Sequence, residues 1–290
     1  MFSMKRILAP VDFSERSVGA VRYMQALAEH FAAESTLLHV LPPPHYEFSS
    51  MEVGGTVIAD LFEARMKQVR EDLDSFLVEE FPGLRAGRVL LEGDPARKIV
   101  EYAQDSHTDL IVVPTHGHGP FRRFILGSVT AKILHDADCP VWTGVHLEEA
   151  RDAEKISFRT ILAAVDLGPQ SERSLVWAAA MAESYKARLI VIHAVHCAEE
   201  PDSDRGETGW KARLTAECQG ELEKLLEDIT QPAEVLIEHG DAPEVVCSAA
   251  RQMGADLLVI GRGSAAGVFG RLRANAYSII RTSPCPVVSV

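Results

Sequence analysis

The sequence contains no run rich in lysine or arginine, and its basic side chains are outnumbered, with 29 Lys and Arg against 42 Asp and Glu. The formal net charge is −13 and the sequence pI is about 5.3. Nucleic-acid binding needs a basic face, so we expect no nucleic-acid partner. No apolar stretch approaches the roughly 18 residues of a membrane span, so we expect no membrane association. The start, MFSMKRILAPVDF, runs directly into an apolar segment. We therefore expect no secretory signal and a cytoplasmic location.

Cysteine is also scarce, and no two cysteines form a CxxC pair. Cys139 and Cys285 each precede a Pro-Val dipeptide at corresponding places in the two halves of the chain. We interpret them as small buried residues kept reduced rather than as redox centres.

What the chain does contain is a long internal repeat. Ile7–Asp12 (ILAPVD) matches Ile161–Asp166 (ILAAVD), and Gly93-Asp94 matches Gly240-Asp241. A repeat of this length indicates two copies of a domain rather than a solenoid of short units. We place the domains at 1–147 and 158–290, with a charged linker at His146–Phe158.

Each half alternates short apolar runs with amphipathic segments. In the first half the expected strands are 6–11, 36–41, 87–91, 110–114 and 140–145, and the expected helices are 14–31, 60–81, 95–104 and 127–135. Continuous apolar strands alternating with helices predict an α/β fold, with a parallel sheet covered by helices on both faces in each domain. Such doubly wound sheets bind ligands beyond the carboxyl ends of their strands, near a switch in strand order.

A glycine-spaced loop follows the fourth expected strand of the first half. Gly117 is followed ten positions later by Gly127-Ser128, whereas the second half has Ser264 and Ala274-Asn275 at the same places. The loop is not a Walker P-loop, because no Gly-Lys-Ser/Thr follows the glycines. The first half is thus equipped to hold phosphates, and the second is degenerate.

With Asp12 at the end of the first strand, and with the run Gly127-Ser128-Val129-Thr130 ahead of Cys-Pro-Val, both halves resemble the universal stress protein family in its tandem form. The resemblance implies two Rossmann-like, adenine nucleotide alpha hydrolase-like domains, each with a five-stranded parallel sheet. It implies adenine nucleotide binding, namely ATP with ADP or AMP as alternatives, and Mg²⁺ accompanying the nucleotide. The residues expected at this site are Pro10, Val11, Asp12, Val40, Val113, Pro114, Gly117, Arg123, Gly127, Ser128, Val129 and Thr130.

In the first site, helix amides near Gly127 would receive phosphate oxygens, since the first amides of a helix lack internal partners. Ser128 and Thr130 would add hydroxyl donors, although Ser128 could equally be a plain helix N-cap. Asp12 would accept hydrogen bonds from ribose hydroxyls or from adenine, or else cap the helix that starts near Ser14. Val40 would meet the adenine edge, by family analogy.

Other polar residues near the loop leave alternatives open. Arg122 and Arg123 would contact a terminal phosphate or remain solvated surface residues. His116 and His118 lack a third ligand in the sequence, so we expect no metal site there. The equivalent histidines of the two halves, His39 and His193, are interpreted as structural.

Pro114 stands where the family motif has its first glycine. If that glycine adopts a positive φ, proline distorts the loop. If the glycine only allows close approach, the ring packs on the ribose or blocks it.

In the second half, Asp166 is retained but Ala274 disfavours a positive φ. Asn275 could still cap a helix, and Gly267 and Gly270 could build a different anion loop near Arg271 and Arg273. Otherwise this domain is a structural partner of the first.

These patterns favour an ATP-binding regulatory protein of the stress response over two alternatives. One is a nucleotide-free module that acts through protein contacts, and the other is an enzyme. No nucleophile–base pair or metal cluster is evident, so we expect at most slow ATP hydrolysis. The apolar last strands would otherwise be exposed edges, so we expect the two domains to pair and the chain to form a homodimer.

Overall fold

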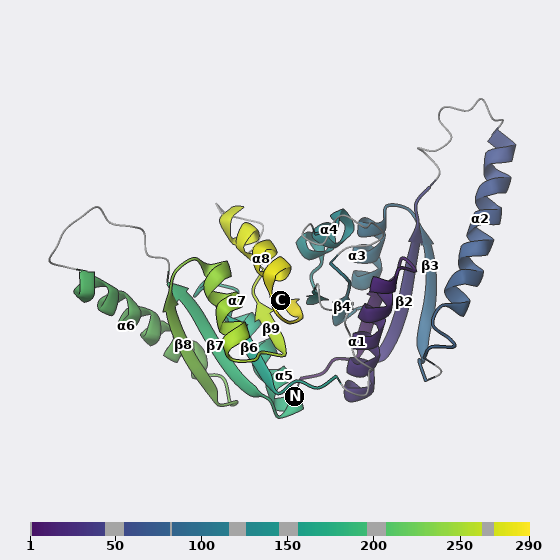
Figure 1. Cartoon of the computed structure of the whole chain (residues 1–290). Helices are drawn as coiled ribbons and strands as arrows, with labels where there is room; N and C mark the ends of the chain where they lie inside the picture. Colours follow the sequence, from purple (N-terminus) through teal and green to yellow (C-terminus); the bar gives the residue numbers. More distant parts are fainter. Residues whose placement is uncertain are drawn as a thin grey trace. The chain divides into compact units, whose positions relative to one another are not determined.

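The computed structural model describes residues 2–43, 55–81, 83–115, 126–144, 156–195, 207–262 and 270–290. The chain divides into two compact units, one built chiefly from residues 3–141 and the other from residues 155–290. Figure 1 shows the same alternation of strands and helices in each.

The first copy begins with a buried strand, because Ile7, Leu8 and Ala9 are each at most 1 % exposed. Its sheet has the order β3-β2-β1-β4-β5, and β1 pairs in parallel with β2 and β4, as β2 does with β3. The elements are β1 (Arg6–Pro10), α1 (Glu15–Phe31), β2 (Glu34–Leu41), α2 (Gly55–Ser75), β3 (Ala86–Glu92), α3 (Pro95–Asp105), β4 (Leu110–Val112), α4 (Ser128–Asp136) and β5 (Val141–Thr143).

The second copy repeats this plan in the order β10-β9-β6-β7-β8. The neighbouring strands of this sheet pair in parallel. The elements are β6 (Thr160–Ala164), α5 (Ser171–Tyr185), β7 (Arg188–Val195), α6 (Glu207–Leu226), β8 (Ala233–His239), α7 (Ala242–Gln252), β9 (Leu257–Ile260), α8 (Gly270–Thr282) and β10 (Val287–Ser289). The predicted fold class, two tandem α/β domains, is confirmed.

The strand order places a switch point in each sheet. From β1 the chain moves outward through β2 to β3, and it then returns to the other side of β1 as β4. Because parallel crossovers are right-handed, α1 and α2 cover one face of the sheet while α3 and α4 cover the other. The ends of β1 and β4 therefore diverge at their carboxyl termini, where doubly wound folds hold ligands.

Several expected boundaries were wrong in the first copy. The strand β2 starts at Glu34 rather than at residue 36, α2 starts at Gly55 rather than at residue 60, and β5 is Val141–Thr143 rather than 140–145. The helix α2 ends at Ser75 rather than at residue 81, because the Ser75 hydroxyl donates to the carbonyls of Glu71 and Asp72 at 3.0 and 3.2 Å and Leu77 adopts a left-handed φ of 60°. The strand β4 ends at Val112, two residues before Pro114.

Candidate functional site

The switch point of the first copy holds a cavity of about 640 Å³. This volume falls within the roughly 300–1,000 Å³ typical of small-molecule sites. Every expected site residue that the structure describes lines it, namely Pro10, Val11, Asp12, Val40, Val113, Pro114, Gly127, Ser128, Val129 and Thr130. The expected residues Gly117 and Arg123 lie outside the described residues, as do His116, His118 and Arg122.

Asp12 is held at the cavity by the start of α1. Its Oδ1 accepts hydrogen bonds from the Ser14 amide at 3.1 Å, the Ser14 hydroxyl at 2.5 Å and the Ser17 hydroxyl at 2.6 Å. The N-cap of α1 is Ser14, whose side chain accepts from the Ser17 amide. Asp12 is therefore not the cap itself. Its carboxylate holds the capping residue Ser14 in place, and the same hydrogen bonds orient the carboxylate in the lining of the cavity.

Phe13 turns the chain sharply after Asp12. Its φ is +63°, a left-handed conformation that costs a non-glycine residue about 1–2 kcal/mol. The Phe13 ring stacks on the His39 ring at 4.5 Å and meets the Phe76 ring edge-on at 5.3 Å. The residue at the same place in the second copy, Leu167, has a φ of +60°. Both copies thus share the turn that presents the aspartate.

The histidine of β2 is tied to the end of β1. Nδ1 of His39 donates to the Val11 carbonyl at 2.7 Å, and Nδ1 of His193 donates to the Val165 carbonyl at 2.9 Å. These contacts fit the structural role expected of both histidines, and both also line their cavities. Burial lowers the pKa of His39 below 6.5, although its hydrogen bond to Val11 and the charge of Asp12 act in the opposite direction.

The helix α4 begins at the rim of the cavity. Its N-cap is Gly127, with φ −61° and ψ 146° and with no side-chain capping bond. The alternative in which Ser128 is the N-cap was wrong, because Ser128 is the first helical residue. Gly127 also needs no positive φ. Its amide donates to the Thr115 carbonyl at 2.8 Å, which joins the start of α4 to the segment after β4.

The first turn of α4 has amides without an acceptor inside the helix. Ala131 is the first residue whose amide bonds within the turn, donating to the Gly127 carbonyl at 2.8 Å. The preceding amides, those of Ser128, Val129 and Thr130, have no intrahelical acceptor by the geometry of the α-helix. All three residues line the cavity, where the helix dipole favours an anion.

Thr130 does not donate its hydroxyl as we expected. Thr130 is 4 % exposed, and its Oγ1 donates to the Pro114 carbonyl at 2.9 Å. The hydroxyl therefore joins the segment after β4 to α4 instead of facing a phosphate. Pro114 is buried at the same place, and its carbonyl is satisfied by this bond.

Sequence reasoning missed the contribution of α2. Arg65, Val69 and Asp72 line the cavity, and their spacing of four and three residues puts them on one face of the helix. That spacing was visible in the sequence, but the sequence did not indicate which face of this helix would line the cavity. Other residues that were missed at the cavity include Phe13, Pro95 and Ile99.

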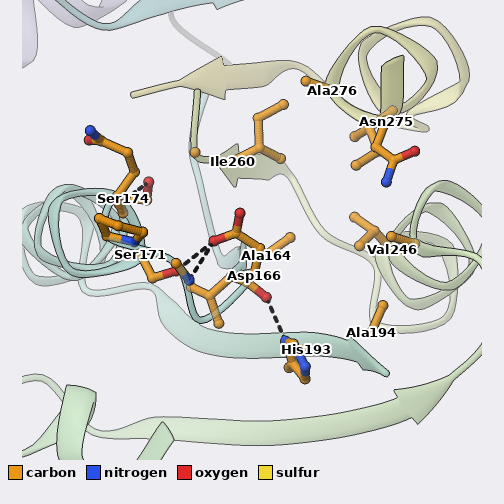
Figure 2. Close-up of a pocket in the computed structure, with 17 residues that line it drawn as sticks. Ala164, Asp166, Ser171, Ser174, His193, Ala194, Val246, Ile260, Asn275 and Ala276 are labelled. Carbon is orange, nitrogen blue, oxygen red and sulfur yellow. Dashed lines mark hydrogen bonds between the residues drawn. The ribbon is translucent and has the colours of Figure 1, made fainter. Parts of the chain in front are cut away.

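The second copy has a cavity of about 400 Å³ at the corresponding switch point. Figure 2 shows Asp166 held there much as Asp12 is held, with Oδ1 accepting from the Gly168 amide and the Ser171 hydroxyl, each at 2.9 Å. Asn275 lies across the cavity from Asp166 in this view.

The helix that follows differs between the copies. The structure starts α8 at Gly270, so Ala274 and Asn275 lie inside the helix and not before it. The expectation that Asn275 could cap a helix was wrong. Gly267 lies outside the described residues, as do the side chains of Arg271 and Arg273.

Two further features bear on the class of protein. Within the described ranges, no group of three or more His, Cys, Asp or Glu side chains could hold a metal ion. No helix among the described residues is long and apolar enough to cross a membrane.

Comparison with known proteins gives a consistent result. A model described as the universal stress protein family matches residues 4–143 and 157–290. A universal stress protein of Methanocaldococcus jannaschii is 31% identical over 137 residues, which cover 47% of this chain and 79% of that protein. A universal stress protein of Mycolicibacterium smegmatis is 25% identical over 304 aligned residues, which cover 98% of this chain and 96% of that protein. The crystal structure of a universal stress protein from Archaeoglobus fulgidus superimposes with a TM-score of 0.68 at 22% identity, covering 99% of this chain and 98% of that one.

Proposed function

The chain belongs to the universal stress protein family, and from that membership we propose that its first domain binds an adenine nucleotide as a regulatory ligand in the stress response. The observation that carries this proposal is the placement of the α4 amides. The amides of Ser128, Val129 and Thr130 lack intrahelical acceptors and belong to residues that line the cavity also lined by Asp12. The lining can therefore receive an anion at the start of α4 and also presents the carboxylate of Asp12.

The polar groups of the site match the phosphate and the ribose of a nucleotide. Phosphate oxygens accept hydrogen bonds from the α4 amides, and the Ser128 hydroxyl is a further donor beside them. Ribose hydroxyls donate to the Asp12 carboxylate, whose orientation is set by Ser14 and Ser17. The base would lie between these groups and β2, against Val40 and its neighbours in the lining.

Arg65 is the described cation of the cavity lining and offers a charge partner for a phosphate. A guanidinium suits this role because it donates several hydrogen bonds in a fixed plane. Mg²⁺ would enter with the nucleotide, since that ion is bound largely by phosphates and water. We propose binding without dedicated catalysis, with slow ATP hydrolysis at most.

One observation favours a second candidate function. The Thr130 hydroxyl is bonded to Pro114, so the site has one phosphate donor fewer than expected. A nucleotide-free module that acts through protein contacts is therefore the alternative. A cytoplasmic location and a homodimer complete the proposal, and the homodimer is tested by light scattering of the purified chain.

The deciding experiment uses the repeat as its own control. Val129 and Ala276 occupy equivalent positions in the two copies and line the two cavities. We expect ATP or ADP to be released on denaturing freshly purified protein, or to bind in a millimolar titration. We expect Val129→Trp to abolish that binding and Ala276→Trp to preserve it.

Absence of binding at millimolar ATP in the wild-type chain would overturn the proposal and leave the nucleotide-free module. Retention of nucleotide by a folded Val129→Trp variant would contradict the assignment to the first copy. Circular dichroism and the thermal midpoint of each variant establish that it is folded.

A further inference from the structure

A second hollow of the first copy lies where α2 ends and the chain turns toward β3. Its volume is about 840 Å³. It shares Phe13 and Asp72 with the cavity at the switch point, and its other lining residues are its own. Part of its lining is apolar, namely Phe13, Phe76, Leu77 and Val78. We call this surface the α2 groove.

The apolar part of the α2 groove is formed by the hydrogen-bonded turn that follows α2. Leu77 adopts a φ of 60° and is 4 % exposed, so it anchors the turn in the core. The Val78 amide donates to the Ser75 carbonyl at 3.2 Å, and the Phe81 amide donates to the Leu77 carbonyl at 3.0 Å. Val78 is left 50 % exposed although it is apolar. Because the backbone is already held in this form, a partner would lose little free energy in ordering it.

Carboxylates surround these apolar side chains. Three lie near the end of α2 and two lie in the turn after it, and all five are exposed: Glu71, Asp72, Asp74, Glu79 and Glu80. Among the described residues, only Asp72 of these five has a side-chain partner, because it accepts from Gln68 Nε2 at 2.9 Å. The described lining of the α2 groove includes no lysine or arginine.

The position of these charges is unfavourable for the helix itself. The last turn of α2 carries no basic residue, and the C-terminus of a helix is its negative end, where carboxylates are disfavoured. Glu71 and Asp74 are three residues apart, and like charges at that spacing repel each other. A cation placed in the α2 groove would relieve both effects. The charge of the groove therefore favours a cationic partner.

The partner must combine cationic and apolar groups. A guanidinium suits the α2 groove because it pairs with carboxylates and also stacks on aromatic rings, which Phe13 and Phe76 provide. An apolar side chain suits the exposed Val78. The net charge of −13 argues against a second copy of this chain as the occupant. Nucleic acids and anionic lipids would be repelled by the carboxylates.

We propose that the α2 groove is a docking surface for a basic segment of a partner protein, in which arginines flank an apolar side chain. The arginines would pair with the carboxylates at the end of α2 and in the following turn, and the apolar side chain would cover Val78. Docking requires no nucleotide, so the proposal is independent of nucleotide binding in the first domain. Val78, Glu79 and Glu80 do not line the cavity at the switch point, so they can be changed without altering its lining.

The probe is a fluorescent synthetic peptide of about ten residues in which arginines alternate with leucines, and its binding to the full chain is measured by fluorescence anisotropy. Two control peptides carry serines in place of the leucines or glutamates in place of the arginines. We expect the serine peptide to bind about fivefold more weakly than the leucine peptide and the glutamate peptide not to bind. Added salt should weaken binding of the leucine peptide, because exposed charges are screened.

The second copy provides a control matched in charge. Glu79 and Glu80 lie in the turn after α2, and Glu227 and Asp228 lie in the turn after α6. We expect Glu79→Lys/Glu80→Lys to weaken binding of the leucine peptide by about tenfold or more, because attraction becomes repulsion. Glu227→Lys/Asp228→Lys changes the net charge by the same amount, and it should alter binding by about threefold or less.

A third variant tests the apolar contact. We expect Val78→Ser to weaken binding of the leucine peptide about fivefold, because about half of a valine would lose its burial, and to leave binding of the serine peptide unchanged. Circular dichroism and the thermal midpoint establish that each variant is folded. Three results would overturn the proposal: no binding of the leucine peptide at millimolar concentration, equal weakening by the two double variants, and undiminished binding by a folded Val78→Ser variant.

Discussion

At the scale of single residues, Pro114 shows how a departure from a motif is accommodated. The carbonyl of Pro114 accepts from the buried Thr130 hydroxyl, and the next residue, Thr115, accepts from the Gly127 amide. The proline nitrogen has no hydrogen to donate, but the two hydrogen bonds here use the carbonyls of Pro114 and Thr115. The chain can therefore keep the approach of β4 to α4 without a glycine at this position.

The sequence could name Asp12 as a site residue but not the strain beside it. A left-handed φ is rare for aromatic residues, so the amino-acid sequence does not indicate that Phe13 adopts one. The observed conformation is held by its stacking on His39 and by its edge contact with Phe76. Such strain persists where the surroundings over-determine it, and it is common at binding sites.

His39 provides a prediction at the residue scale. Its pKa is lowered below 6.5, chiefly by burial and also by Arg65, while Val11, Asp12 and Asp72 act to raise it. The folded state therefore favours the neutral ring. The resulting stability is present above the unfolded pKa of about 6.5 and is lost as the pH falls toward the lower folded pKa.

We expect an NMR titration of His39 to give a midpoint below 6.5, and Asp12→Asn to lower it further because a favourable charge is removed. In urea denaturation, the free energy of unfolding should fall less for the His39→Gln variant than for the wild type as the pH is lowered from about 7.5 to about 5. A midpoint at or above 6.5 would contradict the assigned effect of burial.

At the scale of elements, the caps of α3 and α7 offer a matched comparison. Asp94 caps α3, with its Oδ1 accepting from the Arg97 amide at 3.0 Å and its Oδ2 lying 3.6 Å from Lys132 Nζ. Asp241 occupies the same place before α7 but makes no side-chain capping bond. The structural value of the two aspartates should therefore differ.

We expect Asp94→Ala to lower the free energy of unfolding by about 1 kcal/mol, the usual cost of losing an N-cap. Asp241→Ala should cost less, because no capping bond is removed. Chemical denaturation followed by circular dichroism measures both. Equal losses in the two variants would show that the capping bond of Asp94 contributes nothing measurable.

The starts of α4 and α8 mark where sequence reasoning about elements succeeds and where it stops. Gly127 correctly predicted the start of α4, because the glycine breaks the helical pattern. For the second copy, the sequence comparison placed Ala274 and Asn275 at the start of a helix only because they align with Gly127 and Ser128. Without the glycine, the helical pattern of residues 270–282 extends further toward the N-terminus, and the equivalent positions fall inside the helix.

At the scale of the whole molecule, the duplication preserves the framework of the site and changes its anion end. Both copies keep an aspartate after the first strand, a left-handed residue next to it, and a histidine bonded to the strand end. The repeat in the sequence predicted this shared framework. It could not predict that α2 would bring Arg65 to the first cavity, because that depends on how the helix packs on the sheet.

Amide hydrogen exchange of the full chain would measure the protection of both copies in one experiment. Without ligand, the amides of Ser128, Val129 and Thr130 lack intrahelical acceptors and should exchange quickly, whereas those of Asn275 and Ala276 lie inside α8 and should be protected. ATP at about one hundred times its dissociation constant stabilises the bound form by about 2.7 kcal/mol. We therefore expect exchange in the first turn of α4 to slow by about a hundredfold, if phosphates accept from these amides.

The same experiment with adenosine is the control for the phosphate, and the two matched variants separate the copies. Adenosine has no phosphate to occupy the first turn of α4, so the amides of Ser128, Val129 and Thr130 should continue to exchange quickly in its presence. Val129→Trp should remove the effect of ATP on the α4 amides, and Ala276→Trp should preserve it. Fast exchange of the α4 amides in saturating ATP would contradict a phosphate at this helix, even if the nucleotide were bound elsewhere on the chain.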